Sequence, residues 1–291
     1  MPCTTNFSVI TAIAVAVGGV FVFPVTRADE PKVVTSNADT SDIKPQVPNV
    51  DSLVIPNGPM GDTIRLGRDL VADTAIHPLT KPFVGNALNC TSCHLENGTH
   101  AKAATFIGIA TAYPAYSPRE KRVITLEDRV LNCFMRSCNG VRPPLGSRPS
   151  VAITAYITWL SSGQRIAMNA SKPLGPFAVQ GIALDGSKQD VDRGKVLYSE
   201  RCADCHGDDG LGDDASPPVW GDLSYNDGAG LAVNVKLASW LKVSMPPGEE
   251  DLTEQESLDI ASYINSHRRP KFILSEHLPA KEGMGEYNAE P

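Results

Sequence analysis

The chain has 291 residues, enough for two modest domains with additional segments. Its formal net charge is −7, and its Lys and Arg residues form no basic block. Because phosphate binding requires clustered Lys and Arg, the composition argues against nucleic acid as a partner.

Residues 1–28 are predicted to be a secretory signal peptide. The apolar run 9–25 is followed by Thr26-Arg27-Ala28, which offers a cleavage site before Asp29 and predicts export to the periplasm or another place outside the cytoplasm. The alternative is an uncleaved membrane anchor, for which the run is short. Residues 29–61 are rich in proline and polar residues and are predicted to be an extended linker.

Two Cys-x-x-Cys-His sequences follow, and this signature marks covalent attachment of c-type haem. In each copy the two cysteines bind the vinyl groups of the haem and the histidine ligates the iron. One copy alone is compatible with a redox dithiol. Two copies in separate domain-sized segments predict two covalently attached haems. The residues are Cys90, Cys93 and His94 in the first copy and Cys202, Cys205 and His206 in the second.

The segments around the two copies share one plan. In the first, predicted over 62–170, a helix at 62–71 contains Gly67, and close contact with a second helix at 151–160 would explain a glycine there. In the second, predicted over 191–270, a helix begins at 191 and a Thr253–Glu256 capping box opens a closing helix at 257–267. This internal repeat predicts an all-α protein of two tandem cytochrome c domains, each enclosing one haem.

The remaining segments connect or end these domains. Residues 171–190, rich in Gly, Pro and Ser, are predicted to be the inter-domain linker, and residues 271–291 a polar tail.

The second haem is predicted to have Met245 as its distal iron ligand. Met245 stands before Pro246-Pro247, some way after the second motif, and a thioether ligand raises the reduction potential. The alternatives are that Met245 is a core residue, or that His267 or Met284 is the ligand. With His206 and Met245 as ligands, this haem would accept electrons and pass them out of the protein.

No Met-Pro follows the first motif, and a helix with an unusual face takes its place. Thr125 and Asp128 form a capping-box variant, and Asn139-Gly140 ends the helix. Arg129, Cys133 and Ser137 are spaced four residues apart and share one face. A neighbouring cation favours a thiolate, the form of cysteine that attacks sulfur and binds metal, and arginine suits the oxygens of a sulfur oxyanion.

Other roles for these cysteines remain open. Cys133 and Cys138 could be buried thiols or form a disulfide, although five residues of separation on one helix would require unwinding. Cys138 alone is interpreted as structural, and Arg136 as a salt-bridged structural residue. Cys138, His77 and His100 are alternative ligands of the first haem.

From about residue 62 to about residue 271 the sequence resembles the dihaem thiosulfate dehydrogenase / tetrathionate reductase family. The motifs that carry the resemblance surround both haem signatures. They are Gly85–Cys90, Tyr113–Arg119, Thr125–Arg129, Cys133-Phe134 with Arg136-Ser137 and Asn139-Gly140, Trp220-Gly221, Ser224–Asn226 and Gly228–Gly230. Two positions depart from the family: Cys138 stands where Met is commoner, and Ser244 stands where some members have a Lys that can ligate the second haem.

The resemblance implies that Cys133 is the distal ligand of the first haem and the catalytic sulfur, with Arg119, Arg129 and Ser137 as active-site residues. The expected reaction joins two thiosulfates to tetrathionate, or the reverse. Electrons would pass from the first haem to the second and then to an external carrier, such as a small cytochrome c or another periplasmic protein. The alternatives are a non-catalytic dihaem electron carrier and an enzyme acting on another sulfur compound.

Overall fold

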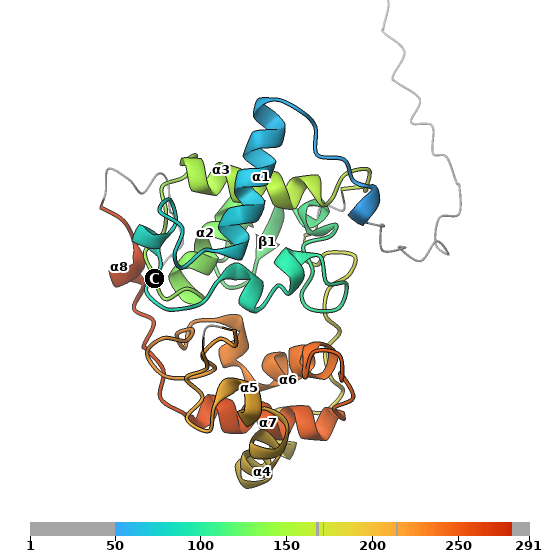
Figure 1. Cartoon of the computed structure of the whole chain (residues 1–291), viewed down its shortest axis with the longest axis vertical. Helices are drawn as coiled ribbons and strands as arrows, with labels where there is room; N and C mark the ends of the chain where they lie inside the picture. Colours follow the sequence, from blue (N-terminus) through green and yellow to red (C-terminus); the bar gives the residue numbers. More distant parts are fainter. Residues whose placement is uncertain (1–49, 167–168, 171, 214, 281–291) are drawn as a thin grey trace, which may run out of the picture. The chain divides into compact units, whose positions relative to one another are not determined.

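The computed structural model describes residues 50–166, 169–170, 172–213 and 215–280 (Figure 1). The expected signal peptide, most of the expected linker and Met284 lie outside the described residues. None of the described helices has both the length and the apolar character needed to cross a membrane.

Helices make up most of the regular structure, as predicted. The α-helices are α1 (Pro59–Ala72), α2 (Leu126–Arg136), α3 (Arg148–Trp159), α4 (Val191–Arg201), α5 (Ala203–His206), α6 (Asn234–Ser244), α7 (Glu254–Ser266) and α8 (Leu274–His277). The short 3-10 helices are η1 (Val50–Ser52), η2 (Lys81–Phe83), η3 (Cys90–Ser92), η4 (Glu96–Gly98), η5 (Ile109–Ala112), η6 (Gly186–Lys188) and η7 (Gly230–Ala232).

In the first domain, α1 and α3 pack at the glycine that the sequence singled out. A Cβ atom on Gly67 would lie 2.0 Å from the Ala152 carbonyl oxygen and 2.7 Å from the Tyr156 Cβ. Such distances are far below van der Waals contact, so only glycine allows this approach. The predicted helix contact is confirmed, and the apolar core of the domain forms around it, with Leu70, Ile153 and Tyr156 almost fully buried.

The second domain repeats this contact between α4 and α7. A Cβ atom on Gly194 would lie 2.0 Å from the Asp259 carbonyl oxygen. The predicted capping box is present: the Thr253 hydroxyl accepts from the Glu256 backbone N–H, and the Glu256 carboxylate accepts from the Thr253 N–H at 2.8 Å. The core of this domain contains Tyr198, Trp240 and Leu258.

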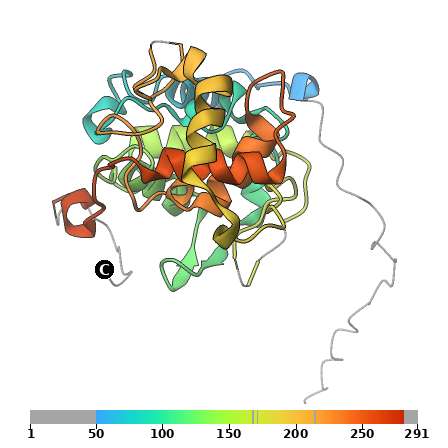
Figure 2. The same cartoon turned by 90° about the horizontal axis from the view of Figure 1, so that it is seen from below.

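A two-stranded antiparallel hairpin interrupts the all-α pattern and was not predicted. Strands β1 (Ala115–Ser117) and β2 (Arg122–Ile124) form this hairpin, drawn in green in Figure 2. In its register Ala115 lies opposite Ile124. Lys121, in the turn, has a positive φ of 51°. The hairpin leads directly into α2. The pairing of its two strands therefore determines where the hairpin turn, residues 118–121, lies relative to that helix.

Hydrogen bonds join the two domains at several points. The Trp240 indole N–H, on α6, donates to the Cys93 carbonyl oxygen at 3.0 Å. Asn226 Nδ2 donates to the Met135 carbonyl oxygen at 2.9 Å. Asn86 Nδ2, in the first domain, donates to the Ser224 carbonyl oxygen at 3.0 Å. Side chains and backbone around the first haem motif and at the end of α2 are thus held by the second domain.

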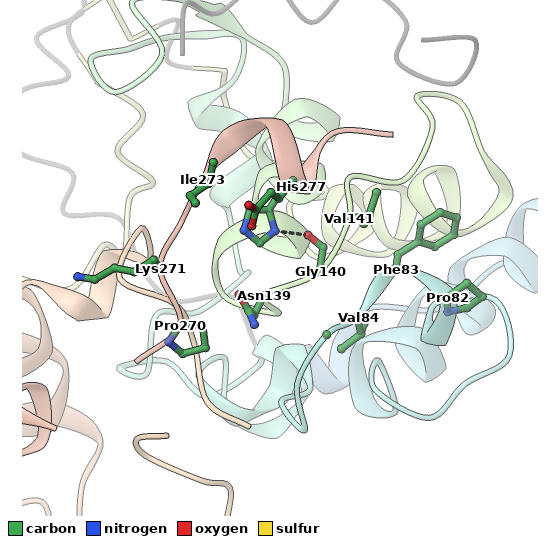
Figure 3. A pocket seen from close by; sticks show the side chains of 12 residues that line it. Pro82, Phe83, Val84, Asn139, Gly140, Val141, Pro270, Lys271, Ile273 and His277 are labelled. Carbon is green, nitrogen blue, oxygen red and sulfur yellow. Dashed lines mark hydrogen bonds between the residues drawn. The ribbon is translucent and has the colours of Figure 1, made fainter. Parts of the chain in front are cut away.

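After α7 the described part of the expected tail returns to the first domain. His277, only 7% exposed, has Nδ1 2.7 Å from the Gly140 carbonyl oxygen, a contact drawn in Figure 3. The His277 ring stacks on the Phe272 ring. The Arg136 guanidinium lies 4.0 Å from the centroid of the Phe272 ring. An open pocket of about 530 Å³ lies between this segment and residues 82–85 and 139–141.

Candidate active site

The first haem motif begins in η3 and is anchored to the end of α1. Asn89 and Ser92 form a capping box at η3. The Thr74 hydroxyl accepts from the Cys90 backbone N–H at 2.9 Å and lies 3.2 Å from Cys90 Sγ. These bonds hold the Cys90 thiol at the wall of an internal cavity of about 380 Å³, which Cys93 and His94 also line.

The His94 ring has the tautomer and the neutral charge that metal ligation requires. Its Nδ1 lies 2.5 Å from the Ala104 carbonyl oxygen, which makes Nδ1 the protonated nitrogen and leaves Nε2 as the ligand atom. Burial lowers the pKa of His94 to about 4, so the imidazole is neutral at pH 7, as ligation requires. The Phe106 ring packs against it, with 4.2 Å between ring centroids.

The rest of the cavity wall fits a haem. Most of its residues are apolar, and they come from the haem loop, α2, α3 and the segment 173–179. They include Leu88, Phe106, Ile107, Ile109, Leu126, Val130, Phe134, Ile153, Ile157, Phe177 and Val179. Two thiols, one neutral imidazole and an apolar enclosure are the groups that a covalently bound haem needs.

The polar face of α2 also lines this cavity, as the spacing predicted. Arg129, Cys133 and Ser137 are all in its wall, and Arg129 Nη1 donates to Cys133 Sγ at 3.1 Å. The electrostatic influence of Cys133 raises the pKa of the Arg129 guanidinium, and the Tyr113 side chain also hydrogen-bonds Arg129. The predicted capping box at Thr125 and Asp128 is confirmed and fixes the start of this helix.

Arg119 lies in the hairpin turn, is exposed and is not among the residues that line the cavity, but its neighbour Glu120 ties this turn to α2. Buried Glu120 accepts a hydrogen bond from Asn132, and Asn132 accepts one from Arg142 Nη1 at 2.7 Å. Asn132 directly precedes Cys133, so the turn is tied to the helix beside the cysteine. Burial and the positive charge of Arg129 lower the pKa of Arg119, which places the two guanidinium groups within electrostatic range.

A third cation near the site was missed by sequence reasoning. Burial and the charges of Arg119 and Arg129 lower the pKa of Lys236 on α6. No local sequence signal could have found it, because Lys236 belongs to the second domain and comes within electrostatic range of the two arginines only through domain packing.

The other candidate residues near the first motif make contacts that suit structural roles. Cys133 and Cys138 are both free thiols, so the disulfide alternative is wrong. Cys138 is buried and also lines the cavity. Arg136 lies over Phe272 rather than in the cavity wall, which agrees with a structural role through a ring contact. His77 Nδ1 accepts from the Leu79 backbone N–H at 3.2 Å.

The second motif has a simpler setting. His206 Nδ1 lies 2.9 Å from the Pro217 carbonyl oxygen, which again leaves Nε2 as the ligand atom. Cys202 and Met245, the latter directly after α6, pack against the same apolar core. His267 instead stacks on Trp220, with 3.8 Å between ring centroids. The donor set of two cysteines, a histidine and a thioether fits a second haem.

Comparison with known proteins gives consistent results for both halves. Residues 81–166 match the family "SoxA/TsdA, cytochrome c domain", and residues 189–264 match "Cytochrome C oxidase, cbb3-type, subunit III". A thiosulfate dehydrogenase of Stutzerimonas stutzeri is 33% identical over 90% of this chain and 85% of its own length. One from Allochromatium vinosum is 38% identical over 75% of this chain and 83% of its own length.

The chain belongs to the thiosulfate dehydrogenase family. A solved structure, thiosulfate dehydrogenase (TsdBA) from Marichromatium purpuratum in its as-isolated form, agrees with a TM-score of 0.70 at 35% identity. The match covers 80% of this chain and 51% of that one, so this chain corresponds to about half of the TsdBA chain. Family membership confirms the expected resemblance and the fold of two cytochrome c domains, and it implies c-type haem.

Proposed function

We propose that this protein interconverts thiosulfate and tetrathionate, using two covalently attached c-type haems. In the oxidative direction two thiosulfate dianions lose one electron each and form a single S–S bond. The observation that carries this proposal is the contact between Arg129 Nη1 and Cys133 Sγ, 3.1 Å long, in the cavity that also presents Cys90, Cys93 and His94.

The ligand residues follow from the donor sets. Cys90, Cys93 and His94 would hold the first haem, with Cys133 as distal ligand, and Cys202, Cys205, His206 and Met245 would hold the second. When bound, each haem takes up one electron at a time, and two such groups match the two electrons that the reaction releases.

Cys133 would supply the reactive sulfur. Its thiolate and the outer sulfur of one thiosulfate join in an S–S bond as two electrons leave, giving a cysteine-bound thiosulfonate. The outer sulfur of a second thiosulfate then attacks the sulfur attached to Cys133. The bond to Cys133 breaks, tetrathionate leaves and the thiolate is restored. The hydrogen bond from Arg129 stabilises that thiolate as the leaving group.

The arginines would offset the electrostatic repulsion between the two thiosulfate dianions. At a separation of about 5 Å and an effective dielectric constant of about 20, two dianions repel each other by on the order of 10 kcal/mol. Arg129 and Arg119 would bind sulfonate oxygens and offset this repulsion, and the Ser137 hydroxyl would donate a further hydrogen bond. Arginine suits this role because its planar fork matches two oxygens at once.

Electrons would leave through the second haem to an external carrier, either a small cytochrome c or another periplasmic protein. We place the protein outside the cytoplasm, where haem is attached to Cys-x-x-Cys-His motifs, with residues 1–28 as the export signal. Acidic residues beside the second motif, among them Asp208 and Asp209, would favour a basic carrier.

The deciding experiment measures reduction of ferricyanide by thiosulfate with the purified holoprotein, together with tetrathionate formation. We expect one tetrathionate for every two ferricyanide ions reduced. Absence of turnover in both this assay and the reverse assay, with two haems attached per chain, would leave the protein as an electron carrier.

A further inference from the structure

Helix α6 is the part of the second domain that lies against the first haem motif. The Trp240 indole N–H donates to the Cys93 carbonyl oxygen at 3.0 Å. Leu95 and Ala104, which follow the first motif, pack against the apolar core that contains Leu237 and Trp240. The contact is therefore both polar and apolar, and it fixes α6 beside the cavity.

Lys236 lies on the side of α6 that faces the first domain. It precedes Trp240 by four residues, so the two side chains share one face of the helix. Leu237 and Leu241 lie further round the helix and are buried in the same apolar core as Trp240. Lys236 is exposed overall, although its ammonium group is partly shielded from water, and its flexible stem can extend along the interface.

The charges around Lys236 are positive. Burial and the charges of Arg119 and Arg129 lower the pKa of its ammonium group. Among residues 50–280 as far as the structure describes them, no carboxylate forms a salt bridge with Lys236 or Arg119. The charge of Glu120 also acts on both arginines, but this carboxylate is paired with Arg122 at 3.3 Å. Arg119, Arg129 and Lys236 therefore repel one another, and a bound anion removes that repulsion.

We propose that Lys236 is a substrate-binding residue of the first-domain site, where its ammonium group holds a sulfonate of thiosulfate or tetrathionate together with Arg119 and Arg129. This inference rests on the proposed function for the identity of the anion. Three cations balance most of the charge of two thiosulfates, whereas two arginines alone leave half of it uncompensated. Since Lys236 comes from the second domain, the site is complete only when both domains are docked.

The test compares Lys236→Gln and Lys236→Arg with Lys195→Gln, which removes the same charge from an exposed position on α4. Two quantities are measured on each holoprotein: KM and kcat for thiosulfate, and the thiosulfate dissociation constant of the oxidised protein from its Soret absorbance. We expect Lys236→Gln to raise both KM and the dissociation constant about tenfold, with kcat changed less than threefold. Lys236→Arg should retain most of the affinity, and Lys195→Gln should match the unchanged protein.

The outcomes separate this inference from the proposed function. If the unchanged protein binds thiosulfate but does not turn it over, the proposed function fails, while weaker binding by Lys236→Gln still supports the anion site. If Lys236→Gln binds thiosulfate as tightly as Lys195→Gln does, the inference is overturned whatever the turnover. A loss of affinity equal in Lys236→Gln and Lys236→Arg would also overturn it, because it would indicate disturbed domain packing rather than a lost charge.

Discussion

The two Cys-x-x-Cys-His motifs lie in domains with the same helix contact but face different surroundings. Each histidine donates its Nδ1 proton to a backbone carbonyl, of Ala104 in the first domain and Pro217 in the second. The polar face of α2 lines the cavity of the first motif, whereas Met245 packs against the apolar core beside the second motif. One scaffold can therefore support substrate chemistry or electron transfer, depending on the element that covers the haem.

The largest effect is expected from Cys133→Ala, which removes the sulfur from the first site only. Turnover with thiosulfate should fall at least a hundredfold, about 2.7 kcal/mol of barrier. The thiolate signature in electron paramagnetic resonance should disappear while both haems stay attached. Cys138→Ala is the matched control and should keep the signature. A signature that survives Cys133→Ala would identify Cys138 or His77 as the ligand instead.

Arg129→Gln should give the next largest effect, because it removes both the bond to Cys133 Sγ and a cation for the substrate. We expect at least a tenfold loss of turnover, about 1.4 kcal/mol of barrier, with haem content unchanged. Lys at this position should restore only part of the activity, since it lacks the planar fork. Arg68→Gln, on the exposed side of α1, is the control. Unchanged turnover in both Arg129→Gln and Arg119→Gln would remove the case for an anion site.

Met245→Gly tests the proposed ligand of the second haem. A thioether favours ferrous iron, whereas an anionic thiolate favours ferric iron, so the second haem should have the higher reduction potential. Redox titration of the variant should show the higher-potential component moving down while the lower one stays in place. Turnover should change only a few-fold. A shift confined to the lower-potential component would mean that the two haems are assigned in reverse.

The smallest effects are expected from substitutions that remove the N-cap threonine of each capping box. Thr125→Ala and Thr253→Ala each remove one N-cap hydrogen bond and should lower the free energy of unfolding by about 1 kcal/mol. Only Thr125→Ala loosens the helix that carries Arg129 and Cys133, so it alone should raise KM for thiosulfate. Urea unfolding and steady-state kinetics on both variants check this. An equal change of KM in the two variants would show that α2 does not depend on its cap.

The features that the sequence predicted are local ones. Haem attachment, both capping boxes and the face shared by Arg129 and Cys133 depend on residues a few positions apart. The packing role of Gly67 could also be predicted, because a glycine inside a helix needs a compensating contact and α3 offers the surface for it.

What could not be predicted depends on distant parts of the chain. The hairpin that carries Arg119 has strands of only three residues, too short for a pattern of alternating polarity. Its turn is held by Glu120, Asn132 and Arg142, which come from three separate segments. Lys236 comes within electrostatic range of the first-domain arginines through the docking of α6, and Arg136 contacts the ring of Phe272, which lies far along the chain.

The return of the chain to the first domain after α7 sets an order for biosynthesis. The contact between His277 and the Gly140 carbonyl oxygen cannot form until nearly the whole chain has emerged, whereas the Cys90–His94 segment emerges much earlier. The covering of residues 139–141 by this segment is therefore among the last tertiary contacts that the emerging chain can form.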